Sequence, residues 1–342
     1  MMKTRIILLA VMLMWAVLGG CETKYVTPPN KPKDPEPEYE VPEGQDKLSF
    51  RLMSFNIRES TAEVAGNEWS RRQGAVYRMF QDINPDIVAF QELRREQYKY
   101  LKEKFGAEYT FFTYAKDGKL ASGRVADIKD DTSFANGGQR QAYMIRTSMF
   151  EMLEWGRYWF SETPDKSSYS WDAGTPKLTL WLKMKAKATG KEFWIFNTHF
   201  FPSGDVGKLH CTLMSVERMK QAVGDTTKEG KGTNDKTIFF CADCNMEYAD
   251  GQNRLAAMKD WMWHGNVNAP QRDDSKTYSG FRDNPATWTT IDHIFYRNAV
   301  NKGYKVVRID TAVTALKADA KWTAQVVTPD NIGEYTQKVT TA

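Results

Sequence analysis

The sequence predicts an α/β fold whose strands are covered on both faces. Apolar runs of strand length alternate along the chain with segments in which apolar residues recur at helical spacing. The run "IVAF" within residues 86–90 is continuously apolar, unlike a strand that has one face in water. Just before it, Val76, Met79 and Phe80 fall on one face of a helix. This combination favours an α/β sandwich over a single half-exposed sheet.

In the first third of the chain, the expected elements alternate in type. The first strand is expected at residues 48–57, which include several large apolar residues and neither Gly nor Pro. The helix that contains Val76 should end before Pro85, because proline cannot continue a helix. Residues 86–90 form the next strand, and a second helix runs from Tyr98 through Phe105.

The rest of the chain repeats this alternation with longer loops. Residues 107–190 are expected to contain strands and long loops, including a turn-rich loop at 159–177. The remaining expected elements are strands at 135–146, 179–186, 192–200, 236–245 and 288–296, a helix at 206–223, and a strand at 304–313 that pairs beside 288–296.

The first residues are typical of an export signal. Lys3 and Arg5 precede an apolar run that ends in "LGGC", and the run is too short to span a bilayer as a helix. This pattern resembles a bacterial lipoprotein signal, which implies a signal peptide at residues 1–20 and a lipidated Cys21. The alternative is ordinary cleavage with Cys21 incidental. The lipoprotein interpretation places the protein in the cell envelope, anchored to a bacterial membrane and facing the periplasm or the surface.

A tether and one folded domain follow. Residues 21–46 are dominated by Pro, Glu and Lys, which favours an extended stalk. Residues 47–342 contain no internal repeat and are expected to form one domain. The whole chain carries +4, and removing the signal and the acidic tether leaves a domain of about +6. That mild charge suits an anionic small substrate or weak nucleic-acid contact, and excludes the strong basic surface of a dedicated DNA-binding protein.

Aromatic residues make up 13% of the chain and include 11 Trp. A thick aromatic core is the first interpretation, and a stacking surface for sugars or bases is the second.

Cys241 and Cys244 have a C-x-x-C spacing that suggests zinc or redox chemistry, but strand geometry argues against it. Side chains alternate between the faces of a strand, so the two thiols point apart, with Cα atoms about 10 Å from each other. A disulfide needs a Cα separation below about 7 Å, and a shared zinc needs converging ligands. We therefore expect these cysteines to be small buried hydrophobes.

Asp243 and Asn245 lie on the same face at the end of this strand. Polar residues also follow or lie at the ends of other apolar runs, and these are Asn56, Glu92, His199 and Asp292. Several strands that deliver carboxylate, amide and imidazole groups to one sheet edge form the usual site of an α/β architecture. The pattern predicts a site for a hard cation, a water molecule and a phosphate.

At this point the chain resembles the endonuclease/exonuclease/phosphatase superfamily, whose fold is that of deoxyribonuclease I. The matching segments are "MSFNIR", "IVAFQEL", "WFSETP", "FNTHF", "CADCN" and "TIDHIFY", which occur in that order between residue 48 and about residue 297. The resemblance implies a four-layer α/β/β/α sandwich in which two mixed β-sheets pack face to face with helices outside. It also implies a phosphoesterase site that uses Mg²⁺ or Mn²⁺.

The resemblance assigns a role to each predicted site residue. Glu92 is similar to the family's metal-binding glutamate, and Asn56 to the asparagine that completes the metal and water network. Asp243 resembles the aspartate that orients or deprotonates the attacking water.

The remaining three residues match positions that contact or support the phosphate. Asn245 resembles the amide that holds the phosphate, and His199 matches a position whose side chain contacts it. Asp292 resembles an aspartate that supports the site, whereas the neighbouring His293 should point away from it and be structural.

Two motifs depart from the family pattern. The family's usual C-terminal Ser-Asp-His strand is absent, since no histidine follows His293. Truncation, replacement by another residue, and loss of catalysis are the three open explanations. Arg58 also stands where nuclease relatives often carry an acid.

The sequence therefore predicts an exported, membrane-anchored, metal-dependent phosphoesterase. Its substrate would be a nucleic acid, a phospholipid head group, or a sugar or inositol phosphate, and we expect a monomer. The alternative is a non-catalytic ligand-binding lipoprotein on the same fold.

Overall fold

The computed structural model describes residues 48–61, 66–117, 138–224, 236–282 and 284–307. The predicted signal peptide, the lipidated Cys21 and the tether lie outside these residues, and so does the chain after Val307. These predictions therefore stay predictions.

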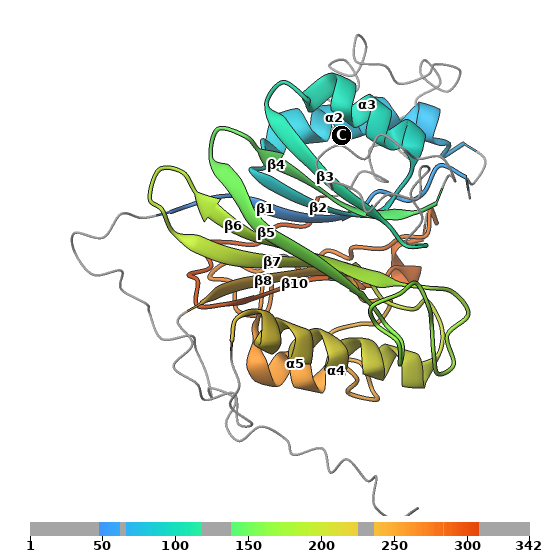
Figure 1. The fold of residues 1–342 in the computed structure, drawn as a ribbon. Helices are drawn as coiled ribbons and strands as arrows, with labels where there is room; N and C mark the ends of the chain where they lie inside the picture. The colour runs from blue at the N-terminus through green and yellow to red at the C-terminus, as the bar shows by residue number, and fades with distance from the viewer. Residues whose placement is uncertain (1–47, 62–65, 118–137, 225–235, 283, 308–342) are drawn as a thin grey trace, which may run out of the picture.

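The described residues form two mixed β-sheets that pack face to face (Figure 1). The four-stranded sheet has the order β1-β2-β4-β3, and the six-stranded sheet has the order β5-β6-β7-β8-β10-β9. The strands are β1 Leu52–Asn56, β2 Ile87–Leu93, β3 Tyr109–Ala115, β4 Arg140–Arg146, β5 Phe150–Trp159, β6 Leu178–Ala186, β7 Glu192–His199, β8 Thr237–Asp243, β9 Trp263–His264 and β10 Asp292–Arg297. The pairs β1–β2 and β7–β8 are parallel, and the others are antiparallel.

Helices cover the outer face of each sheet. Helices α2 (Trp69–Ile83) and α3 (Arg95–Phe105) lie on the four-stranded sheet, and α4 (Asp205–Ala222) and α5 (Ala256–Trp261) lie on the six-stranded sheet (Figure 1). A short 3₁₀ helix, η1 (Pro285–Thr287), precedes β10. The predicted four-layer α/β/β/α sandwich is confirmed.

Apolar side chains fill each of the three spaces between layers. The central space, between the sheets, buries alternate residues of β2 such as Ile87 and Ala89, together with Leu180 of β6. Intervening β2 residues such as Val88 and Phe90 pack under α2 and α3. This explains the continuous apolar run at 86–90, because both faces of β2 are buried. Aromatic rings contribute strongly to the cores, as in the stacked pair Phe50 and Phe193.

The structure differs from the expected elements mainly where a strand is defined by its pairing with another strand. Strands β3, β5 and β9 and helix α5 were not anticipated individually, and β1 is shorter than residues 48–57. The expected strand at 288–296 begins only at Asp292, because η1 and the residues after it precede the ladder with β8. Residues 304–307 are not in a strand, and 308–313 lie outside the described residues.

The cysteine prediction is confirmed. Cys241 lies in the core between the sheets, whereas Cys244 lies on the opposite side of the six-stranded sheet, beneath α4 and α5. Cys211, Cys241 and Cys244 are all buried free thiols. Neither a disulfide nor a shared metal can form between side chains that occupy different layers.

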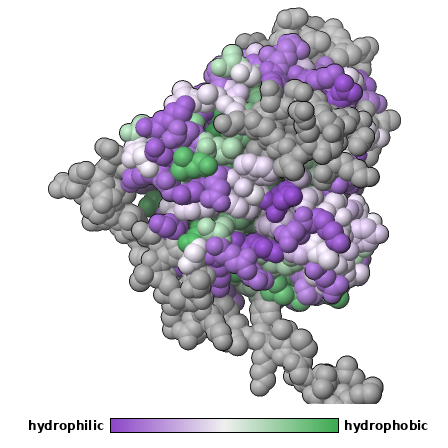
Figure 2. Space-filling model, in the orientation of Figure 1, coloured by the Kyte–Doolittle hydropathy of each residue, from purple (hydrophilic) through white to green (hydrophobic). Residues whose placement is uncertain are grey.

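The surface view in Figure 2 shows a mostly hydrophilic face with scattered hydrophobic side chains. Within the described segments, no helix has the length and apolar character needed to cross a membrane.

Candidate active site

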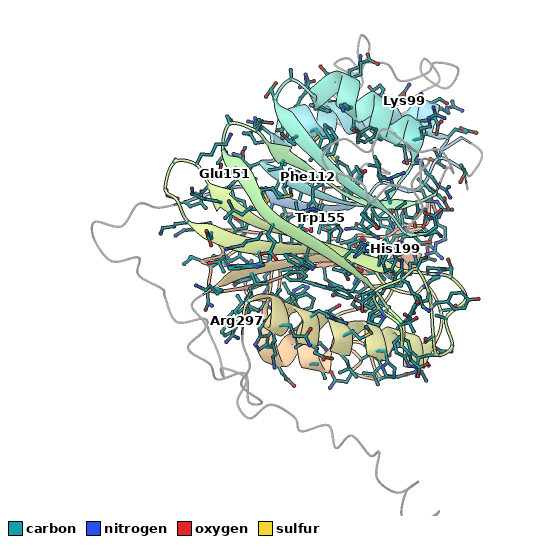
Figure 3. The ribbon with its side chains drawn as sticks, viewed as in Figure 1. Lys99, Phe112, Glu151, Trp155, His199 and Arg297 are labelled. Atoms are coloured by element: carbon teal, nitrogen blue, oxygen red, sulfur yellow. The ribbon has the colours of Figure 1, made fainter. Side chains whose placement is uncertain are left out.

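The predicted site residues meet at one end of the sandwich, between the two sheets. Strand register places His199 opposite Asp243, and Asp243 opposite Asp292. Asp292 does not end its strand, as the sequence suggested, but begins it. It reaches the same edge because β10 runs antiparallel to β8. Figure 3 shows His199 at this end of the molecule, between the two layers of sheet.

A β-bulge directs Glu92 into the site. The pairing of β2 with β4 shifts register between Phe90 and Leu93. Both Phe90 and Leu93 pack toward the helices, so the alternation of faces changes phase between them. Glu92 itself has φ of 62°, a left-handed conformation that costs a non-glycine residue energy. The strained backbone turns its carboxylate toward the space between the sheets.

Asn56 connects the two central carboxylates. Its Nδ2 donates to Oε1 of Glu92 at 3.2 Å and to Oδ2 of Asp243 at 2.8 Å. The second oxygen of each carboxylate accepts from the backbone, from Glu59 N to Glu92 at 3.0 Å and from Asn245 N to Asp243 at 2.9 Å. Groups that are 187 residues apart in sequence are thus held in direct contact.

His199 is a neutral imidazole held beside both carboxylates. Its Nδ1 lies 3.7 Å from Glu92 and its Nε2 lies 3.5 Å from Asp243. Burial, reinforced by the nearby Lys177, holds the pKa of His199 well below its usual range. Asn245 Nδ2 donates to Nε2 of His199 at 2.9 Å and to the Phe200 carbonyl at 3.1 Å.

Two aspartates share the inner wall of the site. Burial raises the pKa of Asp243 to about 6, despite the hydrogen bonds from Asn56 and Asn245. Burial and the adjacent Asp243 raise the pKa of Asp292 well above its usual range. Asp292 Oδ1 is buried and has no hydrogen-bond partner among the described residues. The neutral form of Asp292 is therefore favoured while Asp243 is ionised.

Lys177 is a site residue that the sequence reasoning missed. It lies directly before β6, is only 5% exposed, and lines the same hollow as Glu92, His199 and Asp243. Burial lowers the pKa of Lys177 to about 8, and the two carboxylates oppose that shift. No sequence signal distinguished it, because a lysine at the end of a turn-rich loop is usually a solvated surface residue.

A buried polar link between the sheets supports Glu92 from behind. Gln91 Nε2 donates to Oδ1 of Asn197 at 2.8 Å. Asn197 Nδ2 donates to the carbonyls of Phe90 and Ala142 at 2.8 and 2.9 Å. Gln91 and Asn197 are both fully buried. The link fixes β7 against β2 at the bulge that carries Glu92.

The structural interpretation of His293 is confirmed. Its side chain is fully buried on the far side of β10, where it contacts the Met246 carbonyl at 2.9 Å and His264 at 3.0 Å. Val267 N donates to Nδ1 of His264, so Nε2 of His264 carries the proton given to His293. Neither histidine faces the site.

A hollow of about 2580 Å³ opens at the site and runs along β1. It is lined by the carboxylates described above, by Arg58, whose guanidinium lies 3.9 Å from Glu92, and by Lys116. Position 58, where nuclease relatives often carry an acid, is an arginine in this chain. An acid follows at the next residue, Glu59, and it forms an ion pair with Arg94.

The donor set consists mainly of carboxylate and amide groups, which suit a hard cation such as Mg²⁺. Within the described residues, no three His, Cys, Asp or Glu side chains are grouped as a ready-made metal site. Mg²⁺ needs only one or two carboxylates and keeps several waters. Glu92 and Asp243 provide carboxylate oxygens on either side of the Asn56 Nδ2, whereas the amide oxygen of Asn56 accepts from Arg58 N at 2.9 Å. The unpartnered Oδ1 of Asp292 lines the same hollow.

Comparison with known proteins agrees with this architecture. Residues 53–314 match the model of the Endonuclease/Exonuclease/phosphatase family. Uncharacterized protein L388 of Acanthamoeba polyphaga mimivirus is 26% identical over an alignment of 249 residues, and the match covers 68% of this chain and 82% of that protein.

Two solved structures are similar over most of the fold. The endonuclease/exonuclease/phosphatase from Bacteroides vulgatus has a TM-score of 0.61 and 25% identity, and the match covers 73% of this chain and 87% of that one. The mannosyl-6-phosphatase of Bacteroides thetaiotaomicron has a TM-score of 0.61 and 26% identity, with 76% and 92% covered. The chain belongs to the endonuclease/exonuclease/phosphatase family.

Proposed function

We propose that the protein is an exported, membrane-anchored phosphoesterase that hydrolyses a P–O bond with the help of a divalent cation, Mg²⁺ or Mn²⁺. The observation that carries the proposal is the direct contact of Asn56 with both Glu92 and Asp243 at the mouth of a large hollow. Family membership supports the reaction class. The signal-like first residues and Cys21 support export and anchoring.

Glu92 and Asn56 are the residues that would hold the cation. The carboxylate oxygens of Glu92 suit Mg²⁺, and Mn²⁺ accepts the same ligands. Asn56 would complete the network, because its Nδ2 holds the Glu92 and Asp243 carboxylates while its Oδ1 accepts from Arg58 N. When bound, such a cation neutralises charge on the phosphoryl oxygens and stabilises the leaving oxygen.

The protein's own groups would then act on water and phosphate. Asp243 orients the attacking water and accepts its proton, because its raised pKa makes it a better base than an exposed aspartate. Asp292 would support Asp243, which lies opposite it in the β8–β10 ladder. The Asn245 amide and the His199 ring lie together, where they can contact phosphoryl oxygens.

The substrate class is a phosphoester: a nucleic acid, a phospholipid head group, or a sugar or inositol phosphate. The mildly basic charge of the domain disfavours an extended duplex. One similar structure is titled a mannosyl-6-phosphatase, which favours a sugar phosphate among these classes.

A second function is a non-catalytic ligand-binding lipoprotein on the same fold. The observation that favours it is the absence of any histidine after His293 in the sequence, where the family's Ser-Asp-His motif is expected. Removing one member of a set that acts as a unit can remove most of the catalytic rate.

The test is a hydrolysis assay with p-nitrophenyl phosphate and bis-p-nitrophenyl phosphate in Mg²⁺, Mn²⁺ or EDTA. The wild type should turn over at least one substrate only with the metal. Glu92→Ala and Asp243→Ala should each lower kcat by about 10²-fold or more. Glu96→Ala, which changes an exposed glutamate at the start of α3, is the matched control and should leave kcat unchanged.

Turnover in EDTA, or full activity in either site variant, would contradict the proposed mechanism. Metal-independent ligand binding without turnover on any phosphoester would instead favour the non-catalytic function.

A further inference from the structure

Two lysines line the hollow of the site. Lys177 precedes β6, and Lys116 follows β3, so the two come from different sheets. Lys116 Nζ lies 3.4 Å from the hydroxyl of Thr175, which lines the same hollow. Both lysines act electrostatically on His199, so both ammonium groups approach the site.

Lys177 is buried without a fixed partner. Its ammonium donates no hydrogen bond and forms no ion pair with any residue that the structure describes, although its side chain is 95% buried. Lysine is almost never buried in this way unless it is paired, because an unpaired buried charge is costly. Glu92 and Asp243 act on the Lys177 ammonium through space, because neither carboxylate forms an ion pair with it.

The charges around the site indicate which ligand would pair with Lys177. A divalent cation would balance the two negative charges of Glu92 and Asp243. Lys177 and Lys116, together with Arg58, then remain as positive charge on the wall of the hollow. A terminal phosphate group carries about two negative charges at neutral pH, whereas a phosphodiester carries one.

We propose that Lys177, with Lys116 beside it, binds the non-bridging oxygens of a terminal phosphate group and thereby selects phosphate monoesters over diesters. This inference rests on the proposed phosphoesterase function and names its substrate class. Lys177 provides the buried contact, and Lys116 provides a weaker, more exposed one. Ammonium groups bind phosphate well as compact point charges.

The experiment measures kcat/KM for p-nitrophenyl phosphate and bis-p-nitrophenyl phosphate with Mg²⁺. Lys177→Met should lower the monoester value about 10- to 100-fold, as expected for a lost charge-assisted hydrogen bond, and the diester value by less than about 3-fold. Lys177→Arg should recover part of the monoester rate, and Lys116→Met should lose less than Lys177→Met. Lys185→Met, on the exposed part of β6 where Lys185 pairs with Glu151, is the matched control.

Binding of inorganic phosphate in Mg²⁺, measured by calorimetry, separates this inference from the proposed hydrolysis. Phosphate affinity should fall about 10-fold or more in Lys177→Met and stay unchanged in Lys185→Met. If the wild type binds phosphate through Lys177 but hydrolyses neither substrate, the hydrolytic function fails and the phosphate contact stands.

Three results overturn the inference: unchanged phosphate affinity in Lys177→Met, equal loss on both substrates, or a wild type that prefers the diester. Urea unfolding checks that the variants fold. Removing a buried, unpaired charge should leave Lys177→Met at least as stable as the wild type. If that variant does not fold, the same measurements are made on Lys177→Gln, where a fall in monoester rate and phosphate affinity supports the inference and unchanged values overturn it.

Discussion

Replacing Asn197 by Ala should destabilise the contact between the two sheets. The side chain is fully buried and makes three hydrogen bonds, to the carbonyls of Phe90 and Ala142 and from the amide of Gln91. Each lost bond costs about 1 kcal/mol, and buried groups left without partners raise the cost further. The sum is about 3–5 kcal/mol. In a domain of this size it corresponds to a fall in Tm of about 10 °C.

Urea unfolding of the purified protein, followed by tryptophan fluorescence, measures this change. Gln221→Ala is the control, because this amide lies on the exposed face of α4 and should change stability by less than about 0.5 kcal/mol. Since Asn197 also supports the bulge at Glu92, metal-dependent turnover should fall in Asn197→Ala under conditions where the variant is folded. A loss of stability below about 1 kcal/mol would refute the view that this link holds the sheets together.

Three further predictions follow from particular residues. Gly204→Ala should lower the free energy of unfolding by about 1–3 kcal/mol, because φ of Gly204 is 89° and an added Cβ would lie 2.5 Å from a carboxylate oxygen of Asp172. Gly251→Ala is the control: its Cβ would meet nothing within 4 Å, so it should leave stability unchanged in the same urea assay. Burial lowers the pKa of His293 to about 4 and of His264 to about 2, so the unfolded chain binds protons that the folded chain does not. The contribution of these two histidines to stability should therefore be complete above pH 6.5 and fall by about 1.4 kcal/mol per pH unit for each histidine between pH 6.5 and 4. His264→Asn should reduce the dependence of stability on pH, and an unchanged dependence would contradict the contribution assigned to His264. Burial raises the pKa of every described thiol, so Ellman's reagent should label at most Cys21 in the native protein, and rapid labelling of a second thiol would be inconsistent with the fold.

Much of the site could be predicted because its residues mark the ends of strands. Glu92, His199 and Asp243 each stop an apolar run with a polar side chain, and that change is visible locally. The face assignment within residues 236–245 was also predictable, since strict alternation holds through β8. The structure agrees with both inferences.

The rest depends on pairing between distant segments. The bulge at Glu92 arises from the register of β2 against β4 and has no local signature. Strand β5 was overlooked because it carries charged residues at a sheet edge, where strand propensity is weak. Lys177 was overlooked for a similar reason: its burial arises from the tertiary fold around the hollow, and nothing in its own segment indicates it.

Backbone strain at the site explains why the local sequence does not predict the conformation there. Arg58, Glu92 and Asn245 all have positive φ, between 50° and 62°. Each such residue costs about 1–3 kcal/mol, so the surrounding contacts must impose the conformation. For Glu92 and Asn245 those contacts are the bulge, the Asn56 bridge and the Lys208 ammonium, which donates to the Asn245 carbonyl at 2.8 Å. A fold selected for stability alone would place glycine at these positions. Side chains that stand at such strained positions are expected to be ones whose chemistry the protein uses, and here all three line the same hollow.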